Sequence, residues 1–266
     1  MNYIIRSFVL DIQFMNLDLA VWQKIQFIST KYIVLFKNYF FGFTAGVSYA
    51  SIFGKRYYYD DKFGIAYLQS LYVDNAFLKK YISSKSTIID VGANIGQFNF
   101  FCSQYLRASK IYSFEPVKRS FDLLSKNADK NIYNYAISTK KNETFFIPVT
   151  TLMASKYKLT QDDVEEKIKG MHLDSFIKKF HLSHIDLLKI DTEGSEYNVL
   201  QTSKNTLKKS NYILLETSVE RQSAGDILDC ISLLKHIVPK LSLSKIGRTF
   251  EEHDKIVAVD LLFKRN

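Results

Sequence analysis

The sequence predicts an α/β fold with a sheet built from strand–turn–helix units. An apolar run over residues 88–91 stops at a turn with two glycines, and an amphipathic segment follows at once. A second apolar run over residues 185–190 also leads through a glycine-bearing turn into a predicted helix. Units of this kind form the nucleotide-binding sheets that hold ligands at the carboxyl ends of their strands.

The first glycine turn carries five candidate cofactor-binding residues. Gly92 and Gly96 let the backbone turn sharply against a ligand, and the helix that begins near Ile95–Gly96 directs unpaired N–H groups toward it. Gln97 follows this turn. A dinucleotide-binding turn would have glycine where Asn94 stands, and Asp90 would repel a diphosphate. S-adenosylmethionine carries a sulfonium and an ammonium group but no phosphate, so an acidic turn favours it as the ligand.

The next two strands predict the remaining contacts to a nucleoside. One strand ends at Glu115, 19 residues beyond Gly96, and Pro116 stops it. An acidic residue at this distance is placed to accept hydrogen bonds from ribose hydroxyl groups. A third strand over residues 131–138 is predicted to border the adenine near Ala136.

The second glycine turn predicts the reacting end of the site. Asp191 and Glu193 follow the strand over residues 185–190, and Lys189 lies two residues before Asp191. Polar groups at the carboxyl ends of adjacent strands share one crevice. The carboxylates of Asp90, Glu115 and Asp191 are therefore expected to converge there.

The rest of the chain completes the α/β pattern. Residues 148–170 have no clear period, so they are expected to form either a substrate lid or a surface excursion. The last two strands are expected to pair as an antiparallel hairpin. The sequence predicts helices over 64–81, 98–106, 117–128, 175–180 (capped by Asp174) and 227–238, and strands over 57–59, 143–147, 211–218, 241–246 and 255–263.

Composition predicts a globular chain and a reducing compartment. The 266 residues are 47% hydrophobic and 15% aromatic, and the net charge of +9 is spread along the chain without a compact basic run. Cys102 and Cys230 match neither a disulfide framework nor a metal site, so both are expected to be buried thiols. With no signal peptide recognised, the sequence predicts a cytoplasmic location.

Residues 1–56 are predicted to form a hydrophobic, helical extension of the domain over residues 57–266. Charged residues interrupt the extension regularly, so it contains no stretch of ~20 apolar residues that could span a bilayer. Two roles remain open for it. The extension packs on the domain or on a second copy of the chain, or it lies at a membrane surface with Trp22 at headgroup level.

Five motifs carry a resemblance to a known family, in the expected order. They are Asp90-Val-Gly-Ala-Asn-Ile-Gly96, Phe114-Glu-Pro116, Ala136-Ile-Ser138, Leu173-Asp-Ser-Phe176 and Asp186-Leu-Leu-Lys-Ile-Asp-Thr-Glu-Gly-Ser-Glu196. Over residues 57–263 the chain resembles the FkbM-type family of S-adenosylmethionine-dependent methyltransferases. It departs at Gln97, where an aromatic residue is common, and in the long segment 148–170.

The resemblance implies a fold, a cofactor and a reaction. The fold is a Rossmann-like class I methyltransferase fold, with a mostly parallel seven-stranded sheet, one antiparallel strand in its last pair and helices on both faces. The cofactor is S-adenosyl-L-methionine. The reaction is O-methylation of a hydroxyl group on a sugar, glycan or related small molecule.

The catalytic residues predicted for this reaction are Asp191, Glu193 and Lys189. Asp191 is assigned to the boundary between cofactor and acceptor, Glu193 to proton abstraction or acceptor binding, and Lys189 to holding an acid ionised. The charge of Glu193 at a helix N-terminus is an alternative explanation for that residue. Asp191 and Glu193 could also hold Mg²⁺, although no metal site is predicted.

Three other functions remain as alternatives. A nicotinamide dehydrogenase would use a similar fold, but Asp90 and Asn94 argue against it. A nucleic-acid methyltransferase would exploit the basic charge, yet the sequence lacks a pocket motif for an extruded base, so no nucleic-acid partner is predicted. A non-catalytic S-adenosylmethionine-binding scaffold would bind the cofactor without turnover.

Overall fold

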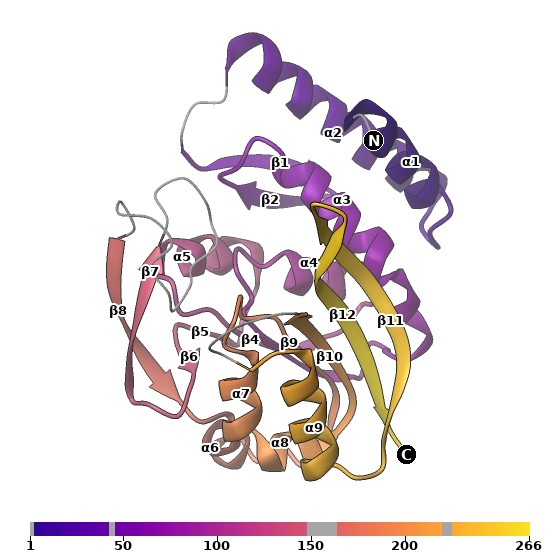
Figure 1. Cartoon of the computed structure of the whole chain (residues 1–266). Coiled ribbons are helices and arrows are strands. Elements are labelled where there is room, and N and C mark those ends of the chain that lie inside the picture. Colours follow the sequence, from indigo (N-terminus) through magenta and orange to yellow (C-terminus); the bar gives the residue numbers. More distant parts are fainter. Residues whose placement is uncertain (1–2, 43–45, 148–163, 220–224) are drawn as a thin grey trace.

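The computed structural model describes residues 3–42, 46–147, 164–219 and 225–266. Its main element is a seven-stranded sheet in the order β11-β12-β10-β9-β3-β4-β5 (Figure 1). β12 pairs antiparallel with both of its neighbours, and the other pairs are parallel, which confirms the predicted mostly parallel sheet. The strands are β3 (Thr87–Val91), β4 (Lys110–Phe114), β5 (Ile132–Tyr133), β9 (Ile185–Ile190), β10 (Ser210–Ser218), β11 (Leu241–Glu252) and β12 (Lys255–Arg265).

Helices cover both faces of the sheet, as predicted. Side chains alternate along each strand, so Ile88 of β3 packs into one core with α3 and α4, whereas Ile89 packs into a second core with α6 to α9. The first layer contains α3 (Gly64–Asn75), the short 3₁₀ helix Ala76–Lys80, α4 (Gln97–Gln104) and α5 (Lys118–Asn127). The second contains α6 (Leu173–Lys179), α7 (Glu196–Thr202), α8 (Lys204–Lys209) and α9 (Ile227–Ile237).

The predicted strand over residues 131–138 is wrong as a single element. Its first half is β5, and its second half is β6 (Ala136–Ile137), which leaves the main sheet and pairs with β8 (Val164–Met171). The side chain of Asn134 donates hydrogen bonds to the carbonyl oxygens of Glu115 and Pro116, and so anchors the chain where it changes sheets.

A small sheet of β6, β8 and β7 (Asn142–Ile147) lies beside β5 (Figure 1). Residues 164–169 of β8 pair with β7, and Gly170 pairs with Ala136 of β6, so the end of the segment predicted to be irregular, residues 164–170, is a strand. The rest of the predicted lid lies outside the described residues. The predicted helix cap at Asp174 is also wrong: Asp174 lies within α6, and its carboxylate accepts hydrogen bonds from the backbone N–H groups of Asn205 and Thr206 at the start of α8.

The N-terminal extension packs against the α3 side of the molecule. It contains α1 (Tyr3–Met15), α2 (Val21–Phe41) and β1 (Ser48–Ile52), which forms a hairpin with β2 (Lys55–Tyr59) across the boundary predicted at residue 56. Phe14 and Phe27 are fully buried in the same core as Tyr72 of α3. None of the helices in the described residues has the length and apolar run needed to cross a bilayer.

Candidate functional site

A cavity lies at the carboxyl ends of β3, β4 and β9, where the sequence predicts one. The register aligns Val91 of β3 with Phe114 of β4 and with Ile190 of β9, so the three strands end side by side. Seven of the predicted site residues line the cavity: Gly92, Asn94, Glu115, Pro116, Ala136, Asp191 and Glu193. The remaining four, Asp90, Gly96, Gln97 and Lys189, do not line it.

Gly92 is required by the close approach of two strand ends. Its φ is +82°, and a Cβ atom at this position would lie 1.7 Å from the backbone oxygen of Asp191. The Asp191 N–H donates to the Val91 carbonyl at 3.0 Å, and this hydrogen bond holds the two turns together. Because residue 92 has no side chain, the Asp191 backbone can approach it closely, and a ligand in the cavity can lie against it.

Glu115 and Asn94 supply the polar wall of the cavity. The Glu115 carboxylate accepts hydrogen bonds from the backbone N–H groups of Asn94 at 2.8 Å and Val117 at 2.9 Å. Burial nevertheless raises the pKa of Glu115 to about 7. The Asn94 side-chain oxygen is buried and accepts no hydrogen bond from any described residue. A buried acceptor without a donor is costly unless a ligand supplies one, so both residues fit a nucleoside with hydroxyl and amino groups.

Asp90 does not reach the cavity, although it was expected to converge there with Glu115 and Asp191. Its side chain shares the face of β3 with Ile88, on the α3–α4 side, and is fully buried. Its carboxylate forms an ion pair with Lys189, at 3.6 Å between Nζ and Oδ1. Burial raises the pKa of the Asp90 carboxyl, and Lys189 opposes that effect.

Lys189 connects this buried acid to the cavity. Lys189 pairs with Asp90 across the β3–β9 ladder, and its ammonium donates to Asp191 at 2.9 Å. Burial lowers the pKa of Lys189, but Asp191 and Asp90 together raise it more, so the pKa lies above its usual value. The lysine is therefore a permanent cation that stabilises the charge of Asp191 at the cavity wall.

Gly96 and Gln97 serve the helix that follows the turn. Gly96 is the N-terminal cap of α4 at φ +90°, and a Cβ atom there would lie 2.9 Å from the Leu124 side chain of α5. Gln97 is the first residue of α4. Both residues belong to the start of α4 and do not line the cavity. Their direct contact with the cofactor stays a prediction.

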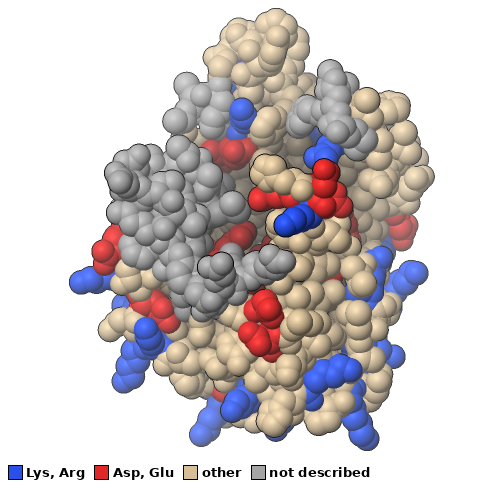
Figure 2. Space-filling view, viewed as in Figure 1, with Lys and Arg blue, Asp and Glu red and all other residues tan. Residues whose placement is uncertain are grey.

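A carboxylate cluster extends the site from Asp191 toward β10. Asp191, Glu193 and Glu216 each place a carboxylate oxygen within 4.8 Å of the other two. Arg248 lies at the far side of the cluster, 3.4 Å from Glu216 and 3.8 Å from Asp260. Figure 2 shows acidic side chains gathered around a hollow in the middle of this face, whereas most Lys and Arg side chains lie toward its lower end.

The cluster keeps one of its acids protonated near neutral pH. Burial is the main cause that raises the pKa of Glu216, and the neighbouring charges of Asp191, Asp260 and Glu193 raise it further. Because like charges this close resist joint ionisation, Glu216 is the neutral member. It can donate a hydrogen bond while its neighbours accept one.

Glu196 organises the second glycine turn, and sequence reasoning gave it no role. One of its oxygens accepts hydrogen bonds from the Thr192 N–H, the Thr192 hydroxyl and the Gly194 N–H, at 2.8–3.1 Å. Glu193 adopts a positive φ of 50° within this turn. The spacing Glu-Gly-x-Glu was visible in the sequence, and an acid in the first helical turn indicates such backbone capping.

The sequence analysis also missed residues that complete the cavity. Tyr135 and Phe145 belong to the segment beyond β5 and to β7, and their position depends on the change of sheets at Asn134. Glu216 lies within the strand predicted over residues 211–218, but it was not assigned to the site. Arg248 and Asp260 lie on the two strands of the final hairpin, and no local motif marks them.

Comparison with known families identifies the domain. Residues 90–256 match the model of the FkbM methyltransferase domain, which is more than half of the chain and includes both glycine turns. The chain belongs to this family. The domain is therefore an S-adenosylmethionine-dependent methyltransferase domain, as the five motifs implied, and the nicotinamide dehydrogenase alternative is excluded.

Characterised relatives are distant. The hexuronic acid methyltransferase AglP of Haloferax volcanii is 26% identical over 164 residues, covering 60% of this chain and 65% of its own length. The methyltransferase sdnD of Sordaria araneosa is 25% identical over 174 residues, covering 50% of this chain and 66% of its own length. The match thus spans slightly less than two thirds of either relative.

Solved structures show similarity at low identity. A crystal structure of an FkbM methyltransferase from Methylobacillus flagellatus KT has 14% identity and a TM-score of 0.45, covering 76% of this chain and 54% of that one. A structure of TYW2 from M. jannaschii in complex with S-adenosylmethionine has 11% identity and a TM-score of 0.43, covering 84% and 88%.

Proposed function

We propose that the protein is an O-methyltransferase that methylates a hydroxyl group of a sugar, glycan or related small molecule. The observation that carries the proposal is the group of three carboxylates at the cavity, Asp191, Glu193 and Glu216, with oxygens within 4.8 Å of one another. Transfer to an alcohol needs a proton acceptor, and polyhydroxyl ligands need several hydrogen-bond acceptors. AglP, which is named as a hexuronic acid methyltransferase, supports the same acceptor class.

The methyl donor fits the cavity between β3, β4 and β9. In our proposal Glu115 accepts hydrogen bonds from the ribose hydroxyl groups, and the unpaired Asn94 oxygen accepts one from an amino group. Gly92 leaves room for the ligand to lie against the backbone, and Ala136 borders the base. When bound, S-adenosylmethionine supplies an electrophilic methyl group on a sulfonium.

In our proposal, residues of this chain position the acceptor oxygen opposite the sulfur–methyl bond of the cofactor. Asp191 lines the cavity and belongs to the carboxylate cluster, and it accepts a hydrogen bond from the Lys189 ammonium at 2.9 Å. Glu193 takes the hydroxyl proton as the new oxygen–carbon bond forms and the sulfur–carbon bond breaks. The products are a methyl ether, S-adenosylhomocysteine and a protonated Glu193 that returns its proton to solvent. A positioned base contributes typically ~10²–10⁴-fold to such a step.

The same cluster could hold a divalent cation, since carboxylate oxygens are the ligands of Mg²⁺. Lys189 and Arg248 already form ion pairs with acids on two sides of the cluster, and burial together with the neighbouring acids raises the pKa of Glu216. We therefore expect activity to persist in excess chelator. Loss of activity in chelator and its recovery with Mg²⁺ would show that the cluster is a metal site.

The test is production of S-adenosylhomocysteine, measured by mass spectrometry, from S-adenosylmethionine and a panel of hexuronic acids, neutral hexoses, oligosaccharides and RNA. We expect turnover with a carbohydrate. Turnover only with RNA would support the nucleic-acid alternative. Micromolar binding of S-adenosylmethionine by calorimetry with no turnover on any acceptor would support the scaffold alternative.

Two matched substitutions test the proposed base. Glu193→Gln removes the proton acceptor, so kcat is expected to fall by ~10²–10⁴-fold with little change in cofactor affinity. Glu216→Gln replaces a protonated carboxyl group by an amide of similar shape, so kcat is expected to change much less. The reverse order of effects would assign the base to Glu216.

A further inference from the structure

The outer side of α1 carries an apolar stripe that is largely exposed. Ile5, Phe8, Ile12 and Met15 follow helical spacing, and 39–62% of each residue is exposed. Such spacing normally marks the face of a helix that packs on a core. Here the core-facing residue is Phe14, which is fully buried.

The neighbouring helix α2 repeats the arrangement over its whole length. Trp22, Ile25, Ile33, Phe36 and Phe40 are spaced at three, four or eight residues, and each is 55–67% exposed. The opposite side of α2 buries Phe27 and Lys31 completely, so α2 is apolar on both sides. We call the two exposed stripes together the α1–α2 face. Apolar surface of this extent on a folded protein usually marks an interaction site.

The two helices are fixed to the body, so their exposure is not the result of loose packing. The buried Lys31 ammonium pairs with Asp11 of α1, and Asp11 also accepts hydrogen bonds from Gln69 of α3 at 2.8 Å and from Tyr32 at 2.6 Å. A buried charged network of this kind specifies one arrangement of helices. The α1–α2 face is therefore presented to its surroundings in a defined orientation.

The charge of the helix pair is positive. The acids of residues 3–42 are Asp11, which pairs with Lys31, and Asp18, which pairs with Lys79. Arg6, Lys24 and Lys37 remain, and the structure places no acid of the described chain in an ion pair with them. An apolar stripe flanked by Lys and Arg, with Trp and Tyr beside it, is typical of helices that lie in the interface of a bilayer.

We propose that the α1–α2 face binds the surface of an anionic lipid bilayer. The apolar side chains enter the boundary between headgroups and acyl chains, and Arg6 and Lys37 extend to anionic headgroups. The Lys24 ammonium instead donates to the Met15 carbonyl oxygen at 2.8 Å. A second copy of the chain fits the face less well, because each copy would bring the same cations to the interface. The helices lie on the membrane and do not cross it.

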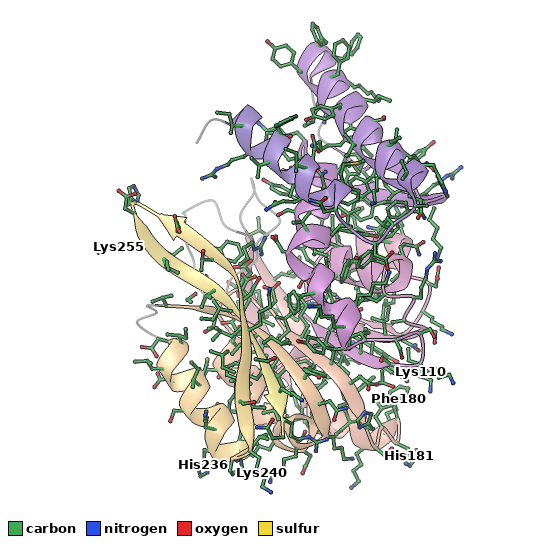
Figure 3. The ribbon with its side chains drawn as sticks, turned by 90° about the vertical axis from the view of Figure 1, so that its right-hand side faces the viewer. Lys110, Phe180, His181, His236, Lys240 and Lys255 are labelled. Carbon is green, nitrogen blue, oxygen red and sulfur yellow. The ribbon has the colours of Figure 1, made fainter. Side chains whose placement is uncertain are left out.

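The α1–α2 face lies at the same end of the molecule as the carboxyl ends of the parallel strands. Figure 3 labels Lys110, His181 and Lys240, which precede or begin β4, β9 and β11, at the lower end. α1 and α2 lie at the upper end in Figures 1 and 3. The carboxyl ends of the parallel strands, where the cavity lies, point toward that end. A bilayer on the α1–α2 face would thus face the cavity end of the sheet.

Trp22 is the chain's single tryptophan, and 62% of it is exposed, so its fluorescence reports directly on the proposal. The full chain is titrated with vesicles of 70% phosphatidylcholine and 30% phosphatidylglycerol, and with pure phosphatidylcholine vesicles. We expect a blue shift of Trp22 emission and quenching by brominated acyl chains with the anionic vesicles. Binding to neutral vesicles should be at least tenfold weaker, and binding to anionic ones should weaken as salt rises.

Matched variants separate the apolar and charged contributions. Phe36→Gln/Phe40→Gln is expected to weaken vesicle binding at least tenfold, whereas Leu228→Gln/Ile246→Gln, which alters two equally exposed residues elsewhere, should not change it. Arg6→Gln/Lys37→Gln should weaken binding about 25-fold, since each basic residue contributes roughly fivefold. Its control is Lys110→Gln/Lys240→Gln at the opposite end.

Two results would overturn the proposal. One is the absence of any Trp22 shift or vesicle co-sedimentation with anionic vesicles. The other is a dimer in sedimentation velocity, without vesicle binding, that Phe36→Gln/Phe40→Gln dissociates, because the face would then be covered by a second copy. Neither result depends on the acceptor, so the proposed methylation can fail or succeed independently.

Discussion

Glu115 and Asp90 are buried carboxylates at the ends of adjacent strands, yet they belong to different regions of the molecule. Glu115 lies one residue beyond β4, lines the cavity and accepts two backbone N–H groups. Asp90 lies inside β3, faces α3 and α4, and pairs with Lys189 beneath the cavity. The register places Asp90 opposite Ser113, so Glu115 lies two residues further toward the carboxyl end of the sheet. That step along the strands separates an acid that can touch a ligand from one that supports the charges around it.

The largest effect on the cavity region is expected from Gly92→Ala. The new Cβ atom would lie 1.7 Å from the Asp191 backbone oxygen, at a φ of +82° that disfavours any side chain. We expect S-adenosylmethionine binding, measured by calorimetry, to be lost. Gly54→Ala is the control, since Gly54 has a φ of +80° with nothing within 4 Å of its Cβ position; it should cost about 1 kcal/mol and leave binding intact. An equal loss of S-adenosylmethionine binding in both variants would show that the clash with Asp191 is not the cause.

The largest effect on the supporting region is expected from Lys189→Met. Removal of the ammonium leaves Asp90 buried without its ion pair and Asp191 without its cation. Breaking a buried pair on one side costs about 3–5 kcal/mol, which urea denaturation would measure. Lys118→Met, which removes an exposed pair with Asp122, should cost less than about 1 kcal/mol. A loss below about 1 kcal/mol for Lys189→Met would show that Asp90 does not need its partner.

Glu115→Gln tests the cavity acid without changing its shape. The amide is a weaker acceptor for ribose hydroxyl groups, and hydrogen bonds to a charged group contribute about 1.5–3 kcal/mol. We expect the Kd for S-adenosylmethionine to rise by about 10–100-fold. The free energy of unfolding should fall by about 1–3 kcal/mol, because the amide can accept from only one of the Asn94 and Val117 N–H groups. A Kd within twofold of the original would remove Glu115 from the ribose site.

The raised pKa of Glu115 gives that affinity a pH dependence. Ribose hydroxyl groups donate to the ionised carboxylate, so binding should be constant above about pH 8 and weaken about tenfold per unit well below its pKa of about 7. The stability of the unliganded protein depends on pH in the opposite direction. Folding raises the pKa of Glu115 from 4.5 to about 7, so this residue stabilises the folded state fully below pH 4.5, and that stability is lost as the pH rises through about 7. In Glu115→Gln both pH dependences should disappear, which calorimetry at pH 6, 7 and 8 would show.

Local patterns determined how much of this architecture could be predicted. The strand before Gly92, the acid at Glu115 and the hairpin at the end of the chain follow from periodicity and turn residues, and the structure has all three. The path beyond Tyr133 could not be predicted, because it depends on the Asn134 side chain binding two carbonyl oxygens of another strand. The cluster of Glu216, Asp260 and Arg248 likewise depends on the register between β10, β11 and β12, which no single segment encodes.

The smallest effect should come from Asp90→Asn, and it decides between the two regions most directly. If Asp90 touched the ligand, as the sequence suggested, loss of its charge would weaken cofactor binding by orders of magnitude. In the structure Asp90 acts only through Lys189, which keeps Asp191 as a partner at 2.9 Å. We therefore expect calorimetry to give a Kd within about threefold of the original and far below that of Glu115→Gln. If Asp90→Asn reduced the affinity for S-adenosylmethionine more than Glu115→Gln does, the buried charge of Asp90 would govern cofactor binding more than the carboxylate of Glu115 in the cavity wall.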